Sequence, residues 1–302
     1  MQRLIEGTPG QEAEVWVQDR GGGPLRLRGT LVIEDLSDVL TEISSRTGAN
    51  GPLNPVTQFM LSEASNHLAE RLSGNDHAKN ARAGHVPRLL STALGHQPFV
   101  ESVLGMSQHQ MLRRWPHATS WYTDVIKYML RPSRFLPTFD SLHEAATAWS
   151  TGTLGEFVRR FADHALGLGF DQTQLRVAEA LQLLWPDYEP MRDAIAAYRH
   201  EVGVLWQPMY FAALRAYGLV LRPGIDPDET AWAMNSMNSR EFLERLAGFT
   251  LEHTDAAGNP WTLTGWNTLV ILAGVCTDED GSPVNPFDLE TRLPVRPITF
   301  DV

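Results

Sequence analysis

The sequence predicts a mainly helical protein with short antiparallel β segments near both ends. Three observations support this fold class. Amphipathic runs with helix start and stop signals fill the middle of the chain, and alternating apolar and polar residues flank glycine-rich turns near each terminus. Hydrophobic residues make up 43% of the 302 positions and charged residues 20%, which is typical of a globular chain.

The N-terminal segment is expected to form a β hairpin. Ala13–Asp19 and Leu25–Ile33 alternate with a period of two, and they flank the turn Gly21-Gly22-Gly23.

The middle of the chain is expected to be helical. An amphipathic run extends from Glu34 to Ile43, and Pro55–Leu72 forms the next helix. A long helix begins at Arg192 and should be kinked at Pro208.

Two further helices carry start signals. Asp171 with Gln174 resembles a capping box, and Asp226 followed by Pro227 and Glu229 predicts a helix over Thr230–Leu246.

The C-terminal segment is also expected to form short β strands. Phe249–His253 and Trp261–Trp266 flank a turn, and Thr268–Val275 and Ile298–Val302 read as further strands. Because isolated hairpins are marginally stable, we expect the two termini to pair into one small sheet. This organisation divides the chain into four parts. Residues 1–50 form an N-terminal β hairpin and helix, and residues 51–131 a DNA-binding-like helical region with the helix-turn-helix. Residues 132–248 form a helical ligand-binding and dimerisation domain, and residues 249–302 a C-terminal β segment that pairs with the N-terminus.

Net charge is unevenly distributed. The chain carries −11, yet the stretch from Ala78 to Arg134 has eight basic residues against two acidic ones and is therefore about +6. Such an island favours contact with phosphates, although an ordinary solvated face is equally compatible with it. The basic residues are Lys79, Arg82, Arg88, Arg113, Arg114, Lys127, Arg131 and Arg134.

The motifs of the common enzyme and metal-site classes are absent from the sequence, so no catalytic residue, metal ligand or cofactor is expected. Cys276 is the single cysteine and is expected to be a buried, unreactive thiol. The longest apolar stretch, Thr268–Cys276, is too short to span a bilayer, so we expect a cytoplasmic protein without membrane contact.

The segment Pro98–Lys127 has the parts of a helix-turn-helix. Phe99–Leu104 can form a first helix, Gly105 a left-handed turn, and Ser107 an N-cap for a second helix over Gln108–Trp115. The side chains expected to face DNA are Ser107, Gln108, His109, Gln110, Arg113, Arg114 and Lys127.

This segment resembles the TetR family of transcriptional regulators. Gly105, Ser107, Trp115 and Pro116 stand at that family's offsets, and Leu221–Asp228 is similar to a turn before one of its last helices; the likeness covers about 98–248. The resemblance implies a helical bundle that dimerises through its last two long helices and binds double-stranded operator DNA. Glu101, Leu104 and Leu112 depart from the family pattern, which puts DNA recognition in doubt.

The helices after residue 120 are expected to enclose a cavity for a small apolar or aromatic ligand. Trp206 and Tyr210, one turn apart beside Pro208, are the leading candidates to line it. Core or dimer-interface roles are the alternative for all the candidates, which are Trp149, Trp185, Trp206, Met209, Tyr210 and Trp232.

The leading hypothesis is a homodimeric TetR-like regulator that senses such a ligand. The alternatives are a TetR-derived ligand- or partner-binding protein that has lost DNA binding, and, ranked last, an enzyme of another type.

Overall fold

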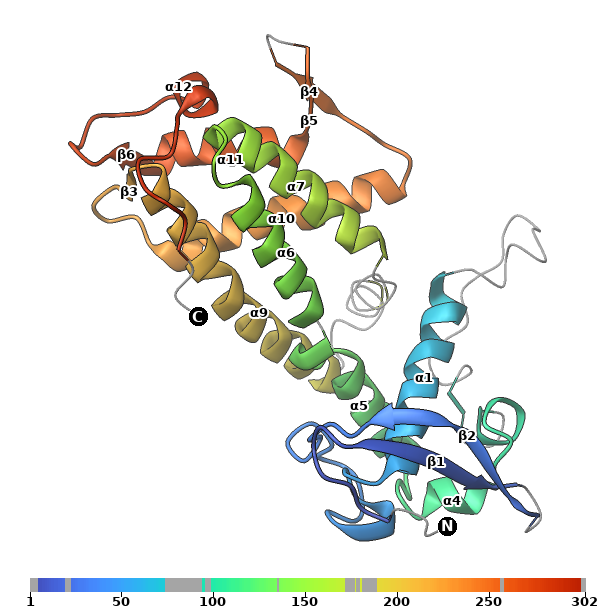
Figure 1. Cartoon of the computed structure of the whole chain (residues 1–302). Coiled ribbons are helices and arrows are strands. Elements are labelled where there is room, and N and C mark those ends of the chain that lie inside the picture. Colours follow the sequence, from blue (N-terminus) through green and yellow to red (C-terminus); the bar gives the residue numbers. More distant parts are fainter. Residues whose placement is uncertain are drawn as a thin grey trace. The chain divides into compact units, whose positions relative to one another are not determined.

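The computed structural model describes residues 5–19, 23–73, 94–95, 99–134, 136–171, 177, 180, 189–255 and 258–299, and most of them lie in helices (Figure 1). The chain divides into two compact units. Unit 1 comprises Met1–Arg131 and Thr173–Ala197, and unit 2 comprises Pro132–Gln172 and Tyr198–Val302.

Unit 1 combines one β hairpin with helices. Its elements are β1 (Glu12–Gln18), β2 (Leu25–Val32), a 3-10 turn (Gly48–Asn50), α1 (Pro55–Ser73), a π-helical turn (Phe99–Val103), α4 (Gln108–Leu112), α5 (Ala118–Met129) and the start of α9 (Glu189–Ala216). The start of α1 is capped by Asn54, whose Oδ1 accepts hydrogen bonds from the backbone N–H groups of Val56 and Thr57 at 3.0 and 3.2 Å.

The N-terminal hairpin is confirmed. β1 and β2 pair antiparallel from Glu12 opposite Val32 to Gln18 opposite Leu25, with a register shift between Val15 and Trp16. Val15 and Val17 are buried in the core of unit 1, so the hairpin is anchored by its alternate residues.

The helix expected from Glu34 to Ile43 is wrong, because this segment forms turns. Its apolar residues Leu36, Leu40 and Ile43 are nevertheless buried. The Arg46 guanidinium donates to the carbonyl oxygens of Ser37, Leu40 and Thr41, and the Gln58 side chain bonds both backbone groups of Glu34. Side chains from outside the segment therefore form hydrogen bonds with backbone groups that would pair with one another in a helix.

Unit 2 is a helical bundle with two small sheets. Its elements are a 3-10 turn (Pro132–Arg134), α6 (Leu136–Trp149), α7 (Leu154–Asp171), the end of α9, β3 (Leu219–Leu221), α10 (Pro227–Leu246), β4 (Glu252–Thr254), β5 (Pro260–Thr262), α11 (Leu263–Val275), β6 (Cys276–Asp278) and α12 (Pro286–Thr291). Helix α7 packs against α6, α10 and α11.

The helix start at Asp226 is confirmed. Its Oδ1 accepts hydrogen bonds from Asp228 N–H at 2.7 Å and Glu229 N–H at 3.3 Å, and Pro227 occupies the first helical position of α10. Pro208 lies inside α9, which is a single helix from Glu189 to Ala216. The expected capping partner of Asp171, Gln174, lies outside the described residues.

The strand expected over Thr268–Val275 is wrong, because these residues belong to α11. Thr262 caps this helix by accepting from Gly265 N–H, and the Glu241 carboxylate accepts from the N–H groups of Leu263 and Thr264. These tertiary contacts pair the first N–H groups of α11 and override the β propensity of its side chains.

The expected sheet between the two termini is also wrong. β1 pairs with β2, β3 with β6, and β4 with β5, so each small sheet closes within one unit. The hairpin over 249–266 is present but shorter than expected, with Glu252 opposite Thr262. The C-terminal region instead buries Trp261, Leu269 and Leu272 in the core of unit 2.

No helix in the described ranges is both long and apolar enough to cross a bilayer.

Candidate functional site

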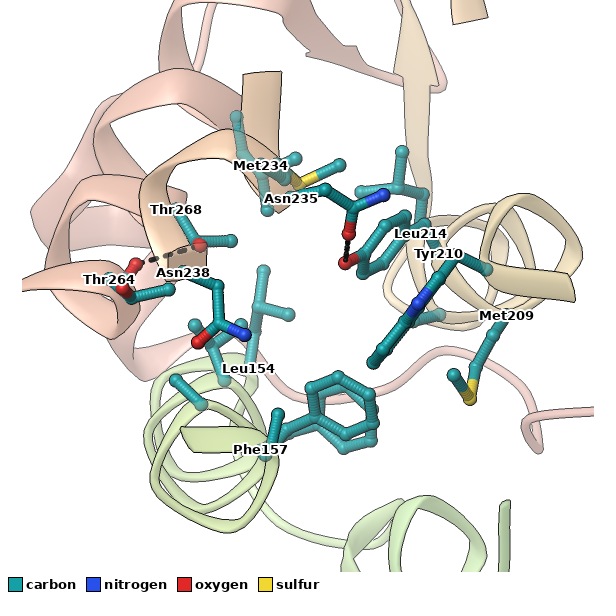
Figure 2. A pocket seen from close by; sticks show the side chains of 17 residues that line it. Leu154, Phe157, Met209, Tyr210, Leu214, Met234, Asn235, Asn238, Thr264 and Thr268 are labelled. Carbon is teal, nitrogen blue, oxygen red and sulfur yellow. Dashed lines mark hydrogen bonds between the residues drawn. The ribbon is translucent and has the colours of Figure 1, made fainter. Parts of the chain in front are cut away.

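A pocket opens within unit 2 between α7, α9, α10 and α11 (Figure 2). It contains about 750 Å³ of space, its open side included. The labelled side chains come from all four helices: Leu154 and Phe157 from α7, Met209, Tyr210 and Leu214 from α9, Met234, Asn235 and Asn238 from α10, and Thr264 and Thr268 from α11.

Aromatic rings form one wall of the pocket. Phe157 and Phe161 on α7 stack with ring centroids 5.8 Å apart, and Trp206 and Tyr210 on α9 stack at 5.5 Å. Phe161 meets Trp206 edge to face at 5.9 Å. Each stacked pair is spaced by four residues, which places both rings on one helix face.

The polar part of the lining consists of amide groups on α10, threonine side chains on α11 and the Tyr210 hydroxyl. Tyr210 Oη donates a hydrogen bond of 2.7 Å to Asn235 Oδ1, as the dashed line in Figure 2 shows. Burial raises the pKa of Tyr210, so its hydroxyl stays protonated and remains a donor. Asn238 Oδ1 is also covered, but it accepts no hydrogen bond from the described residues.

The junction of α10 and α11 is held by Glu241. Burial raises the pKa of this carboxyl, but the opposing hydrogen bonds from the backbone N–H groups of Thr264 and Leu263 and from the Arg245 guanidinium leave it lowered overall. Glu241 therefore stays ionised at neutral pH and holds in place two helices that line the pocket.

The lining offers little for acid–base chemistry. Among the described residues that form it there is no Asp, Glu, His, Cys, Lys or Arg. Tyr210, whose pKa is raised, is the one titratable side chain in that set. The described lining therefore holds no side chain that exchanges a proton near neutral pH.

Three of the six expected pocket residues line the pocket, namely Trp206, Met209 and Tyr210. Trp232 does not, because 70% of its surface is exposed on α10. Trp149 lies outside the lining and packs edge to face against His164, while Trp185 falls outside the described residues.

Four of the lining residues that the sequence analysis did not single out are polar. Asn235 and Asn238 are spaced by three residues on α10, and Thr264 and Thr268 by four on α11, so each pair shares a helix face. This spacing is visible in the sequence, but it gives no sign that the face is turned toward a hollow.

The expected helix-turn-helix segment is only partly formed. Gly105 adopts a left-handed φ of +64°, as expected of the turn. The first helix is a five-residue π-helical turn, and the second, α4, is also five residues long and ends at Leu112 rather than at Trp115. Ser107 precedes α4, but its hydroxyl makes no capping hydrogen bond.

The β hairpin lies against this segment. A Cβ atom on Gly105 would approach Arg28 Nη2 on β2 to 2.9 Å, and Gln110 Nε2 donates to the carbonyl oxygen of Gln18 at the end of β1. One side of the segment is thereby covered.

The expected outward orientation of Arg114 is wrong. Its side chain is 3% exposed, and its guanidinium donates to Thr57 Oγ1, Asn54 Oδ1 and the carbonyl oxygens of Ala49 and Gln110. Arg114 therefore ties α4 to the start of α1.

The other expected DNA-facing side chains are partly accessible. His109 and Arg113 are exposed, and Arg113 Nε donates to His109 Nε2 at 3.0 Å. Ser107, Gln108 and Gln110 are half-buried. Lys127 Nζ donates to Thr41 Oγ1 at 2.8 Å.

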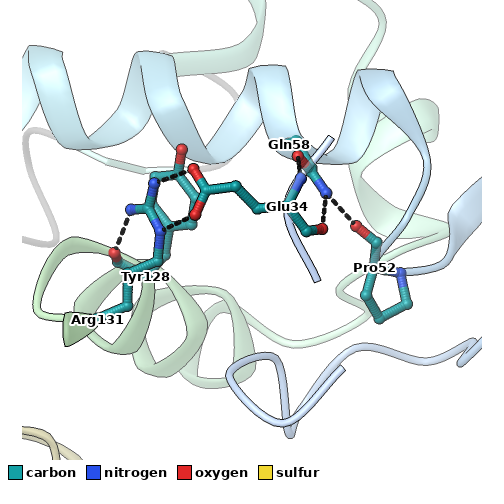
Figure 3. A network of polar contacts seen from close by, with 5 residues as sticks. All are labelled: Glu34, Pro52, Gln58, Tyr128 and Arg131. Carbon is teal, nitrogen blue, oxygen red and sulfur yellow. Dashed lines mark hydrogen bonds and ion pairs between the residues drawn. The ribbon is translucent and has the colours of Figure 1, made fainter. Parts of the chain in front are cut away.

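Arg131, another basic residue of the stretch from Ala78 to Arg134, is also buried and holds a polar network in unit 1 (Figure 3). Its guanidinium forms two hydrogen bonds with the Glu34 carboxylate, at 2.7 and 2.5 Å, and lies 3.7 Å from the centre of the Tyr128 ring. The Glu34 backbone is bound in turn by Gln58, which also donates to the Pro52 carbonyl oxygen. Arg131 is 7% exposed and serves as an internal link between α5, the segment after β2 and α1. Lys79, Arg82 and Arg88 lie outside the described residues.

Cys276 is fully buried, as expected. Burial raises the pKa of its thiol to about 11 despite the opposing charge of Arg222, so the reactive thiolate is scarce at neutral pH. Within the described residues, no group of three or more His, Cys, Asp and Glu side chains could hold a metal ion.

The chain matches no family model, no curated protein and no solved structure.

Proposed function

We propose that the protein binds a small, mainly apolar molecule with a flat ring in the pocket of unit 2. The observation that carries this proposal is the hollow itself, which lies between four helices and is lined by uncharged side chains. A hollow with an apolar lining and a few polar groups is the usual form of a small-molecule site.

The aromatic wall supports a ring-shaped occupant. The rings of Phe157, Phe161, Trp206 and Tyr210 present faces and edges toward one space. A flat ligand gains offset-stacked or edge-to-face contacts there in addition to burial of its own apolar surface.

Ala165 offers a direct test, since it lines the pocket from α7 with a side chain of one carbon. Ala165→Phe should fill the space and weaken binding of 2-methoxynaphthalene, measured by isothermal titration calorimetry, by at least about fivefold, because overfilling typically costs about 1–3 kcal/mol. Ala148→Phe, at an exposed position on α6, is the matched control and should bind as the unaltered protein does. Equal binding by both variants, or no binding by the unaltered protein, contradicts the proposal.

DNA binding through the segment around α4, as in a TetR-like regulator, is the second candidate. The left-handed turn at Gly105 and the exposed His109 and Arg113 favour it. The short α4 and the burial of Arg114 weigh against it and favour a ligand-binding protein without DNA recognition.

Fluorescence anisotropy with a mixed-sequence duplex at low salt tests this candidate. Arg113→Ala should weaken binding and flatten its salt dependence, because one phosphate contact is lost. Arg240→Ala removes the same charge from an exposed position of unit 2 and is the control. Absence of binding by the unaltered protein rejects the candidate.

A further inference from the structure

We infer that the ligand of this pocket is a neutral aromatic molecule with an acceptor atom, such as a carbonyl oxygen, that takes a hydrogen bond from the amide nitrogen of Asn238. The inference rests on the proposed function of the pocket and specifies the chemical class of its ligand. Two properties of the lining lead to it, namely which polar atoms a ligand can reach and which of them still have a proton to donate.

Two oxygen atoms of the lining are out of reach of a ligand. Asn238 Oδ1 and Thr264 Oγ1 are both covered by the protein, and neither has a hydrogen-bond partner among the described residues. Figure 2 shows the Asn238 oxygen turned away from the hollow. These two atoms are therefore not contacts for an occupant of the pocket.

The amide nitrogen of Asn238 lies on the other side of the same group. Nδ2 also has no partner among the described residues, but unlike Oδ1 it keeps accessible surface. In Figure 2 it extends from α10 toward the space that Phe157 borders from α7. The opposite orientation of the amide would enclose two N–H donors in place of one oxygen, which leaves more hydrogen bonds to satisfy in a covered place. The amide therefore presents its N–H groups to the hollow.

Two hydroxyl donors of the lining are already in use. The Tyr210 hydroxyl donates to Asn235 Oδ1 at 2.7 Å, and the Thr268 hydroxyl donates to the carbonyl oxygen of Thr264 at 2.8 Å. The N–H groups of Asn238, by contrast, still need an acceptor once a ligand displaces water from the hollow. A carbonyl oxygen, an ether oxygen or a ring nitrogen at the edge of the ligand ring supplies one.

The neutral character follows from the charges of the lining. All of the described side chains that form the pocket are uncharged, and the Tyr210 hydroxyl stays protonated because burial raises its pKa. A carboxylate or ammonium group placed there loses its hydration without gaining an opposite charge, which costs far more than burial of a neutral polar group. Anionic and cationic aromatic compounds are therefore excluded from the expected class.

Three probes with flat substituents of similar size at one ring position separate these contributions. 2-Acetylnaphthalene carries a carbonyl oxygen, 2-isopropenylnaphthalene has a methylene group in its place, and 2-naphthoate carries a charge. Equilibrium dialysis measures the Kd of each probe for the full chain. We expect 2-naphthoate to bind at least about tenfold more weakly than 2-acetylnaphthalene, because no opposite charge in the lining compensates its lost hydration.

A substitution on α10 assigns the acceptor contact to one residue. Asn238→Leu keeps a similar volume without the amide. It should weaken binding of 2-acetylnaphthalene relative to 2-isopropenylnaphthalene by about fivefold, which is a typical net effect of one hydrogen bond. The ratio of the two Kd values is compared between proteins, because the different hydration of the two probes then cancels. Asn267→Leu, the same change on α11 outside the described lining, should leave this ratio unaltered.

The outcomes separate the acceptor contact from the pocket itself. If the ratio is the same in the unaltered chain and in Asn238→Leu, the contact with Asn238 is overturned and the proposed pocket stands. An equal change of the ratio in Asn267→Leu also rejects Asn238 as its source. Tighter binding of 2-naphthoate than of 2-acetylnaphthalene overturns the neutral class. If none of the three probes binds, the proposed function fails, and this inference fails with it.

Discussion

The core of unit 1 and the pocket of unit 2 differ in the charge of their side chains. In unit 1 the buried ionisable side chains of Arg114, Asp124 and Arg131 each hold two or more hydrogen bonds. In unit 2 the described side chains that line the pocket are all neutral.

This difference separates a structural role from a binding role. A buried charge with several partners fixes one arrangement of the chain, since any other arrangement leaves the charge desolvated and unpaired. A hollow lined by neutral and mainly apolar side chains can gain free energy when a ligand removes its apolar surface from water. Unit 1 is therefore where substitutions should affect folding most, and the pocket of unit 2 is where they should affect binding.

The largest expected effect is at Arg114. Arg114→Ala should lower the free energy of unfolding of unit 1 by about 3 kcal/mol, because Thr57, Asn54 and two carbonyl oxygens lose a shared charged donor. The measurement is urea unfolding followed by circular dichroism. Arg113→Ala, at the exposed neighbouring position, is the control and should change this free energy by less than about 0.5 kcal/mol. Similar losses in both variants would show that unit 1 does not depend on the buried guanidinium.

The second largest expected effect is a pH dependence of the stability of unit 1, which originates from Asp124. Burial raises the pKa of its carboxyl to about 6, although hydrogen bonds from Trp115 and Glu42 and the charge of Lys127 oppose the shift. Between about pH 6 and the ordinary value of 3.8, the folded state is protonated while the unfolded state is ionised. The stability of unit 1 should therefore rise as the pH falls through 6 and level off below about 4, by a contribution on the order of 3 kcal/mol.

Urea unfolding at a series of pH values between 7 and 4 measures this contribution. Asp124→Asn should remove it, whereas Asp38→Asn, at an exposed position of the same unit, should retain it. A variant at Asp124 with the same pH profile as the unaltered protein would exclude this carboxyl as the source.

The smallest expected effect concerns the stability of unit 2 without ligand. Asn238→Leu should raise the free energy of unfolding by about 1 kcal/mol, because an unsatisfied buried amide is replaced by an apolar group of similar size. Asn235→Leu should lower it by about as much, since the Tyr210 hydroxyl then loses its acceptor. Thermal unfolding monitored by calorimetry distinguishes the two. Destabilisation of both variants alike would mean that Asn238 is satisfied in the folded protein.

Local sequence patterns predicted the elements whose limits are set by residues close to them in the sequence. The N-terminal hairpin, the helix that begins at Pro55 and the helix after Asp226 all form. For the hairpin and the helix after Asp226, the signal is a turn or capping group within a few residues of the element, so no distant contact is required. Trp206 and Tyr210 stack and both line the pocket, because residues four apart share a helix face.

Distant contacts decided the elements that sequence patterns misassigned. Gln58 binds the backbone of Glu34 from 24 residues away, and Glu241 accepts from the N–H of Thr264, 23 residues away, at the start of α11, where β-branched residues predict a strand. The same applies to Arg114, which looks like a surface cation at its sequence position but is enclosed by residues near 49–57. A pairwise contact across dozens of residues leaves no periodic signal for a sequence reading to detect.

The sequence by itself determined that the chain is mainly helical, where its hairpin and best-capped helices begin, and that aromatic side chains gather on α9. Only the tertiary structure decided which small sheets close, which arginines are buried, and that Asn238 faces a hollow rather than solvent. The physical reason is that helix periodicity and capping act over a few residues, whereas burial and hydrogen-bond satisfaction depend on which distant groups the fold brings together.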